Sequence, residues 1–372
     1  MRGDTKAMFD RRLVTHFDWW FATTILAMAL LGILTIYSSN ALAISAFRRT
    51  LYLRQMTWVG IGVVALVAAC LVSYRTLGRF AYVIFGLSLV LLVLVLVIGK
   101  AGLGAHRWIR VGGFAFQPSE FAKLGLVLFL ARYFDDHRET LREPRTMLVP
   151  AALTTLCMLL VLKQPDLGTA LLLLFIALSI MLLLGLDWRR LVPFAVGGAA
   201  LAPLLWMLLK DYQRRRILVF LNPDLDPLGA GYHIAQSKIA VGSGGAFGKG
   251  WLAASQSQLN FLPLNHTDFI FAVLAEQWGF LGCLVVLLVY FYLITKGFQI
   301  ARDCTDLFAA VLAAGVSAML TIQVLINTAM VLGMMPVVGI PLPLLSYGGS
   351  SLLVTMLSLG LLLNIHMRRF MY

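Results

Sequence analysis

Residues 80–98 read FAYVIFGLSLVLLVLVLVI, a run of 19 residues without a charged side chain. A transmembrane helix needs about 20 consecutive apolar residues, because each residue adds only ~1.5 Å along the helix axis. The run therefore predicts a helix that crosses a lipid bilayer. Similar runs predict ten such spans, at residues 19–39, 56–73, 80–98, 118–134, 147–163, 168–186, 191–209, 268–295, 307–333 and 343–366.

The composition of the whole chain agrees with this pattern. Of its 372 residues, 60% are hydrophobic and only 13% are charged, whereas soluble domains carry about 25% charged residues. We therefore predict an all-α, polytopic membrane protein that forms a single transmembrane domain over residues 1–372. Its longest polar segment, residues 210–267, is predicted to be an extracytoplasmic loop between spans seven and eight. The four cysteines and six histidines are scattered, which favours neither a disulfide framework nor a His-built metal centre.

The distribution of basic residues predicts the orientation. Ten spans place both termini on one side, and lysine and arginine predominate on that side once the long loop is set aside. Both termini are therefore expected in the cytoplasm. The formal net charge of +13 fits this rule together with an anionic lipid or a phosphorylated substrate, and nucleic acid is not expected as a partner.

Two charged residues lie inside the fourth predicted span. Glu120 and Lys123 are three residues apart and share one face of a helix. Charged groups within a span usually face the protein interior. The pair either neutralises itself and holds neighbouring helices together, or organises a polar cavity beside a catalytic group.

Two aspartates lie at predicted membrane boundaries. Asp166, in QPDLGT, either caps the helix that follows or contacts a sugar or a divalent ion. Asp268, in HTDFIF, stands at the entrance of the eighth span, where it either caps the helix or removes a proton from a hydroxyl nucleophile. Glu276 lies deeper in the same span and is expected to be structural. The sequence has no serine-hydrolase elbow and no HExxH metalloprotease motif.

Several segments together resemble the SEDS family, the shape, elongation, division and sporulation proteins of bacterial cell-wall synthesis. The longest is NTAMVLGMMPVVGIPLPLLSYGGSS at 327–351, joined by FQPSE at 116–120, QPDLGT at 164–169 and HTDFIFAVLAE at 266–276. The segment DPLGAGYHIAQSKIAVGSGG at 226–245 is more similar to the elongation members than to the division members.

The resemblance implies a glycosyltransferase of the inner membrane that polymerises lipid II during cell elongation. The acceptor sugar hydroxyl would displace undecaprenyl pyrophosphate with inversion at the anomeric carbon, and lipid II and the nascent glycan strand would both bind. It implies a class B penicillin-binding protein, a transpeptidase, and the elongation machinery as partners. Asp268 would be the catalytic base, and Glu120, Lys123 and Asp166 the supporting polar core.

The leaving pyrophosphate is strongly negative, so cations on the outer face are expected to stabilise it. The candidates are Arg48, Arg49, Arg107, Arg110 and Lys238. A divalent cation, Mg or Mn, stays open as a cofactor. Two alternatives also stay open, a lipid II flippase and a non-catalytic scaffold for a penicillin-binding protein. The ionisable residues within the spans gather in the predicted outer half, which favours chemistry on one side over transport.

Overall fold

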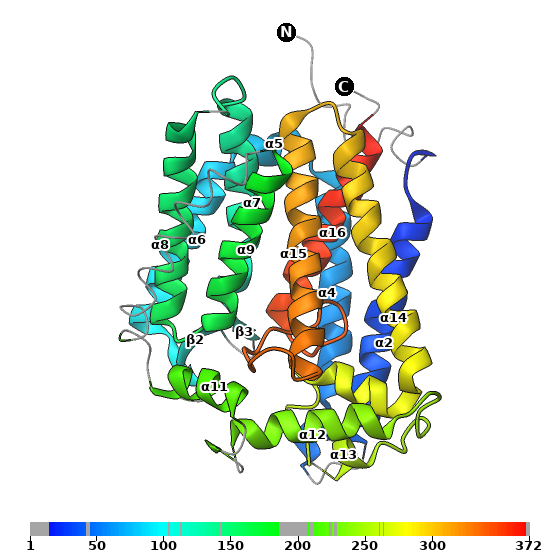
Figure 1. Cartoon of the computed structure of the whole chain (residues 1–372). Helices are drawn as coiled ribbons and strands as arrows, with labels where there is room; N and C mark the ends of the chain where they lie inside the picture. The colour runs from blue at the N-terminus through cyan, green and yellow to red at the C-terminus, as the bar shows by residue number, and fades with distance from the viewer. Residues whose placement is uncertain are drawn as a thin grey trace.

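The computed structural model is a bundle of long helices closed at one end by shorter elements (Figure 1). The residues it describes are 15–41, 45–102, 105–111, 114–141, 143–185, 207, 211–222, 225–226, 229–259, 261–262 and 264–369. The long helices are α2 (Trp19–Asn40), α4 (Leu51–Leu71), α6 (Ala81–Ile98), α7 (Pro118–Asp136), α8 (Leu148–Lys163), α9 (Leu167–Leu183), α14 (Ile270–Asp303), α15 (Leu307–Val331) and α16 (Gly349–Arg368).

Shorter elements connect the long helices. They are α3 (Ala46–Arg49), α5 (Tyr74–Arg79), the 3-10 helix η2 (Pro144–Met147), α11 (Asp211–Leu221), α12 (Ala230–Ser243) and α13 (Ser255–Gln258). Three strands, β1 (Lys100–Gly102), β2 (Ala105–Val111) and β3 (Phe114–Phe116), form a small antiparallel sheet in the order β1-β2-β3. The sequence did not predict this sheet, because its strands are short and follow the most apolar run of the chain.

The prediction of an all-α membrane protein is confirmed in its main features. Seven helices among the described residues are long and apolar enough to cross a membrane. They are Trp19–Asn40, Phe47–Leu71, Ala81–Ile98, Pro144–Lys163, Ile270–Asp303, Leu307–Val331 and Gly349–Arg368.

The other three predicted spans have different outcomes. The span at 118–134 is the helix α7, which is too rich in charge to count as an apolar span, and α9 is a shorter apolar helix of 17 residues. The span at 191–209 lies outside the described residues, so the count of ten stays a prediction. The last span begins at Gly349 rather than at 343, because residues 343–348 form a turn.

The centre of the bundle is formed by α7, α15 and α16, which are buried along most of their length. The helix α16 packs along α4, and α15 packs along α14, α7 and α9. Small residues allow the first of these contacts, since a Cβ on Gly360 would stand 2.7 Å from the carbonyl oxygen of Leu66. The outer helices α4, α6 and α14 instead expose much of their apolar surface, as expected for helices that face lipid.

The two ends of the bundle differ. The strands β2 and β3 and the helices α11, α12 and α13 gather at one end, which we call the loop end (Figure 1). At the opposite end, Lys296 Nζ lies 2.7 Å from Asp18 at the start of α2, and Arg369 Nη1 lies 2.6 Å from Asp303. The start of α2 and the end of α16 therefore lie at the same end of the bundle, as an even number of spans requires.

A break in α14 attaches the segment that follows α12 to the bundle. Gly279 has φ 66° and ψ −164°, a conformation open to glycine because it lacks a Cβ. Backbone groups around the break pair with the loop instead of with their own helix. The bonds run from Phe280 N to Gly245 O at 2.9 Å, Leu281 N to Ala246 O at 3.1 Å, Lys249 N to Glu276 O at 3.0 Å and Gly250 N to Gln277 O at 3.1 Å.

The buried Glu276 has a partner in the same loop. Its Oε1 accepts hydrogen bonds from Lys249 Nζ at 2.7 Å, Ser255 Oγ at 3.2 Å and Gln256 N at 3.1 Å. Its contacts support the structural role that we expected for it.

Candidate functional site

Asp268 lies two residues before α14, at the loop end, in a segment of consecutive turns. The residue is half-buried, and no described residue donates a hydrogen bond to its carboxylate. The carboxylate faces Gly339, where an added Cβ would stand 3.5 Å from Asp268 Oδ2. Glycine at 339, with φ 75°, therefore keeps the space in front of this carboxylate open. The residue that caps α14 is Phe269, so Asp268 is not the N-cap that the sequence left open.

The electrostatic surroundings of Asp268 set its acidity. Burial raises the pKa of its carboxyl group to about 6, because removal from water disfavours the charged form. The positive charges of Arg216 and Arg107 lower this pKa, and the negative charge of Asp166 raises it. An exposed aspartate has a pKa of about 3.9 and would be a weaker base.

The backbone of residues 266–268 is held by the C-terminal part of the chain. Three successive carbonyl oxygens each accept one hydrogen bond from that part. The bonds run from Tyr347 N to His266 O at 2.8 Å, from Ser346 Oγ to Thr267 O at 2.6 Å and from Asn327 Nδ2 to Asp268 O at 2.9 Å. The segment HTD and the signature NTAMVLGMMPVVGIPLPLLSYGGSS, distant in sequence, therefore form one structure.

Asp166 is the N-cap of α9. Its Oδ1 accepts a hydrogen bond from Thr169 N at 3.2 Å, and its Oδ2 accepts one from Thr169 Oγ1 at 2.9 Å. This confirms the capping role that the sequence left open. The same carboxylate lies 4.0 Å from Arg107 Nη1, so it also belongs to the charged group around Asp268.

Arg107 projects from β2 onto the turn that precedes α9. Its Nε donates a hydrogen bond to Gln164 O at 2.9 Å, and its Nη2 donates to Pro165 O. Its planar guanidinium group is thus fixed by two carbonyls and one carboxylate. The small sheet, which the sequence did not predict, is the element that carries this cation to the site.

Glu120 and Lys123 form the buried ion pair that their spacing predicts. Lys123 Nζ donates a hydrogen bond to Glu120 Oε2 at 2.8 Å, and both side chains are buried within α7. Gln117, the N-cap of the same helix, reaches the start of α9, since its Nε2 donates to Ser119 Oγ at 3.1 Å and to Asp166 Oδ2 at 3.4 Å. The FQPSE and QPDLGT segments therefore meet at the loop end.

The predicted cations are not all in one place. Among the described side chains, Arg107 is the predicted cation whose charge acts on Asp268. Arg48 is half-buried and acts instead on His266, where burial and this positive charge lower the histidine pKa to about 4. Arg49 is exposed on α3, and the exposed Lys238 of α12 lies over Gly333 at the end of α15. The side chain of Arg110 lies outside the described part of the chain.

Sequence reasoning missed Arg216 on α11 as a site residue. It is the last of three consecutive arginines, at 214–216, and nothing in that run distinguishes one arginine from the next. Asn327 and Ser346 belong to the signature, but no role for them was predicted from the sequence. A lone buried amide or hydroxyl has no spacing rule that predicts its partner.

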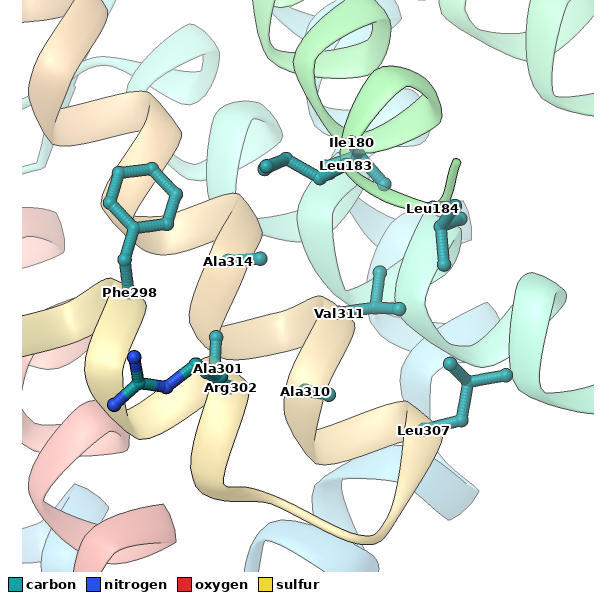
Figure 2. A pocket seen from close by; sticks show the side chains of 10 residues that line it. All are labelled: Ile180, Leu183, Leu184, Phe298, Ala301, Arg302, Leu307, Ala310, Val311 and Ala314. Carbon is teal, nitrogen blue, oxygen red and sulfur yellow. The ribbon is translucent and has the colours of Figure 1, made fainter. Parts of the chain in front are cut away.

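A cavity among the described residues lies elsewhere. It has a volume of about 490 Å³ and opens between α9, α14 and α15 near Leu183, Ala301 and Leu307, at the end of the bundle opposite Asp268 (Figures 1 and 2). Figure 2 shows one charged side chain, that of Arg302, among the ten labelled residues. Its lining is otherwise apolar, so it is separate from the charged group at the loop end.

The described residues contain no group of three or more His, Cys, Asp or Glu side chains close enough to hold a metal ion. Asp166 and Asp268 are the carboxylates at the loop end that act on each other, and both oxygens of Asp166 accept hydrogen bonds from protein groups. A site built from these two residues would need further ligands. Mg or Mn as a cofactor therefore stays a prediction.

Comparison with known proteins identifies the family. The profile FtsW/RodA/SpoVE, described as "Cell cycle protein", matches residues 18–370. The chain is 42% identical to "Peptidoglycan glycosyltransferase MrdB" of Escherichia coli (strain K12), over 98% of this chain and 96% of the relative. It is 34% identical to "Peptidoglycan glycosyltransferase RodA" of Treponema pallidum (strain Nichols), over 96% of this chain and 99% of the relative.

Solved structures support the same family assignment. A chain of the structure described as "Structural coordination of polymerization and crosslinking by a peptidoglycan synthase complex" superposes with a TM-score of 0.82 at 36% identity, covering 96% of this chain and 99% of the other. The crystal structure of the rod shape determining protein RodA from Thermus thermophilus gives a TM-score of 0.70 at 35% identity, covering 95% and 98%. The chain is therefore a multi-pass membrane protein that belongs to the FtsW/RodA/SpoVE family of cell cycle proteins, the SEDS family.

Proposed function

We propose that this chain is a peptidoglycan glycosyltransferase of the bacterial inner membrane that polymerises lipid II during cell elongation. The observation that carries the proposal is the carboxylate of Asp268. It lies at the loop end, and no described residue donates a hydrogen bond to it. It faces Gly339, and the positive charges of Arg216 and Arg107 act on it. The names of its relatives, MrdB and RodA, support the same activity.

Asp268 acts as the general base in this mechanism. Its carboxylate accepts the proton of the acceptor sugar hydroxyl while that oxygen attacks the anomeric carbon of the lipid-linked donor. The bond from the anomeric carbon to the phosphate oxygen breaks, and undecaprenyl pyrophosphate leaves with the electron pair. Attack from the face opposite the leaving group inverts the anomeric carbon.

Two guanidinium groups support the departure of the pyrophosphate. Arg107 is already held by carbonyls and by Asp166, so it needs no reorganisation when negative charge develops. Arg216 lies on α11, and its positive charge also acts on Asp268. Glu120 and Lys123 stabilise the helix α7, which carries Gln117 toward Asp166.

The orientation follows from the direction of the chemistry. The loop end, with α11 and α12, lies on the outer side of the membrane, and both termini lie in the cytoplasm. A class B penicillin-binding protein, which cross-links the new strands, is the partner. The solved relative in a synthase complex that coordinates polymerization and crosslinking supports this pairing.

The test is polymerisation of purified lipid II by the purified chain together with its transpeptidase partner. Glycan chains that form with the transpeptidase active site blocked support the proposal. A parallel assay follows lipid II across vesicle membranes that contain the chain. Lipid II transfer without glycan chains would favour the flippase, and neither activity would favour the scaffold.

A further inference from the structure

We propose that Asn327 and Ser346 are positioning residues that hold the Asp268 carboxylate in its reactive place by fixing the backbone of residues 266–268. The proposal rests on the proposed function, since it assumes that Asp268 is the base. Neither residue need touch substrate, because both act through the carbonyl groups of Asp268 and of the residue before it.

The segment that carries Asp268 has few backbone hydrogen bonds of its own, those of Thr267 N and Phe269 N to Leu264 O. Residues 264–269 form turns outside any helix or strand, and Leu264 has a positive φ of 53°. Carbonyl oxygens in such a segment need partners from elsewhere in the fold. Three successive carbonyls here find those partners in the C-terminal signature, and two of the three donors are side chains that a substitution can remove.

Asn327 connects the two sides of the site. Its Nδ2 donates to Asp268 O at 2.9 Å and to Ile340 O at 2.7 Å. Ile340 directly follows Gly339, which faces the Asp268 carboxylate. One fully buried amide on α15 therefore sets the separation between the carboxylate and the opposite wall.

Ser346 fixes the same segment relative to α4. Its hydroxyl donates to Thr267 O at 2.6 Å and accepts from Leu342 N at 2.8 Å. The turn that contains Ser346 is tied to α4 by Gln55, whose Nε2 donates to Ser346 O at 3.2 Å. The backbone at Asp268 is thus linked by hydrogen bonds to α15 through Asn327 and to α4 through Ser346 and Gln55.

Loosening this clamp changes both the geometry and the acidity of Asp268. A carboxylate displaced by about 1 Å can lose on the order of 100-fold in rate, because proton transfer depends on a near-attack geometry. A looser segment also admits water. Since burial is the cause that raises the carboxyl pKa, hydration moves it back toward the ordinary value.

The experiment compares Asn327→Ala, Ser346→Ala and Ser346→Thr with wild type in the lipid II polymerisation assay over a range of pH. We expect kcat to fall roughly 10- to 100-fold in both alanine variants, with KM for lipid II changed less than about twofold. The acid limb of the pH–rate profile should move to lower pH. Ser346→Thr keeps the hydroxyl and should recover most of the rate.

Two matched controls separate positioning from general stability. Asn364 is also fully buried, and its Nδ2 donates to Ala69 O, Cys70 O and Val72 O at the other end of the bundle. Ser358 is buried, and among the described residues its hydroxyl bonds only within its own helix, to Val354 O at 2.7 Å. Asn364→Ala and Ser358→Ala should lower the melting temperature without moving the acid limb.

A second readout does not need activity. An apolar carbodiimide reacts with protonated carboxyl groups, and mass spectrometry of the peptide that contains Asp268 gives the fraction modified at each pH. The midpoint should lie near pH 6 in wild type and lower in folded Ser346→Ala and Asn327→Ala. If Asn327→Ala does not fold, the result for Ser346→Ala alone tests the positioning role.

Unchanged kcat and an unchanged modification midpoint in folded Ser346→Ala would overturn the positioning role. Failure of the proposed function looks different, because wild type would then form no glycan chains while the modification midpoints could still shift. The two failures are therefore distinguishable.

Discussion

Arg107 Nη1 lies 4.0 Å from Asp166 Oδ1, which joins the small sheet between α6 and α7 to the start of α9. The same guanidinium group bonds the carbonyls of Gln164 and Pro165, so it is fixed before any substrate arrives. An anionic leaving group near Asp268 would meet a cation that needs no further ordering.

We expect Arg107→Lys to reduce polymerisation by roughly 10- to 100-fold, since lysine keeps the charge but cannot bond two carbonyls and a carboxylate as a planar fork. The rate with purified lipid II measures this effect. Arg75→Lys is the matched control, because Arg75 lies 4.0 Å from Asp306 on the other end of the bundle. Equal rates for both variants and wild type would exclude Arg107 from the reaction.

Asp166 combines a cap and a charge, and two substitutions separate them. Asn is as good an N-cap as Asp, so Asp166→Asn should keep the stability of α9 while losing the ion pair with Arg107. Asp166→Ala should lose the ion pair as well and should also lower the free energy of unfolding by about 1 kcal/mol, because alanine cannot cap the helix. Unfolding in mixed micelles measures the loss of the cap, and lipid II polymerisation measures the loss of the ion pair. Wild-type activity of Asp166→Asn would show that the charge of Asp166 has no part in the reaction and that its role is to cap α9.

Lys123→Ala should destabilise the protein by about 3–5 kcal/mol, because it leaves Glu120 charged and unpaired in a buried position. The double variant Glu120→Gln/Lys123→Met removes both charges and should recover much of this loss. Arg132→Ala is the control on the same helix, since its pair with Asp136 has the same 2.8 Å distance but is far more exposed. Arg132→Ala should lower the free energy of unfolding by less than about 1 kcal/mol. A stable, fully active Lys123→Ala protein would contradict the structural role.

The sequence predicted the membrane class, most helices and the pairing of Glu120 with Lys123, because apolar length and helical spacing are local properties. It identified Asp268 and Asp166 but left each with two roles. The role of Asp166 as a cap became visible only with the position of Thr169 N. The contacts of Asp268 with Asn327 and of Arg107 with Asp166 join segments about 60 residues apart, and no local pattern encodes such meetings.

The pH dependence follows from the raised pKa of Asp268. Activity should fall as pH drops through about 6, because the base becomes protonated. The folded state holds this proton more tightly than the unfolded state, whose pKa is about 3.9. Stability therefore falls as pH rises from that value through about 6, and Asp268→Asn should remove this loss. A melting temperature of Asp268→Asn well below that of wild type at neutral pH would contradict the assignment.

The most direct measurement is the rate at which purified Asp268→Asn polymerises lipid II, beside wild type and with equal binding of the transpeptidase. The mechanism predicts glycan chains from wild type and a rate lower by at least about 100-fold from a folded, partner-binding Asp268→Asn protein. Chains formed by that variant at the wild-type rate would contradict Asp268 as the base.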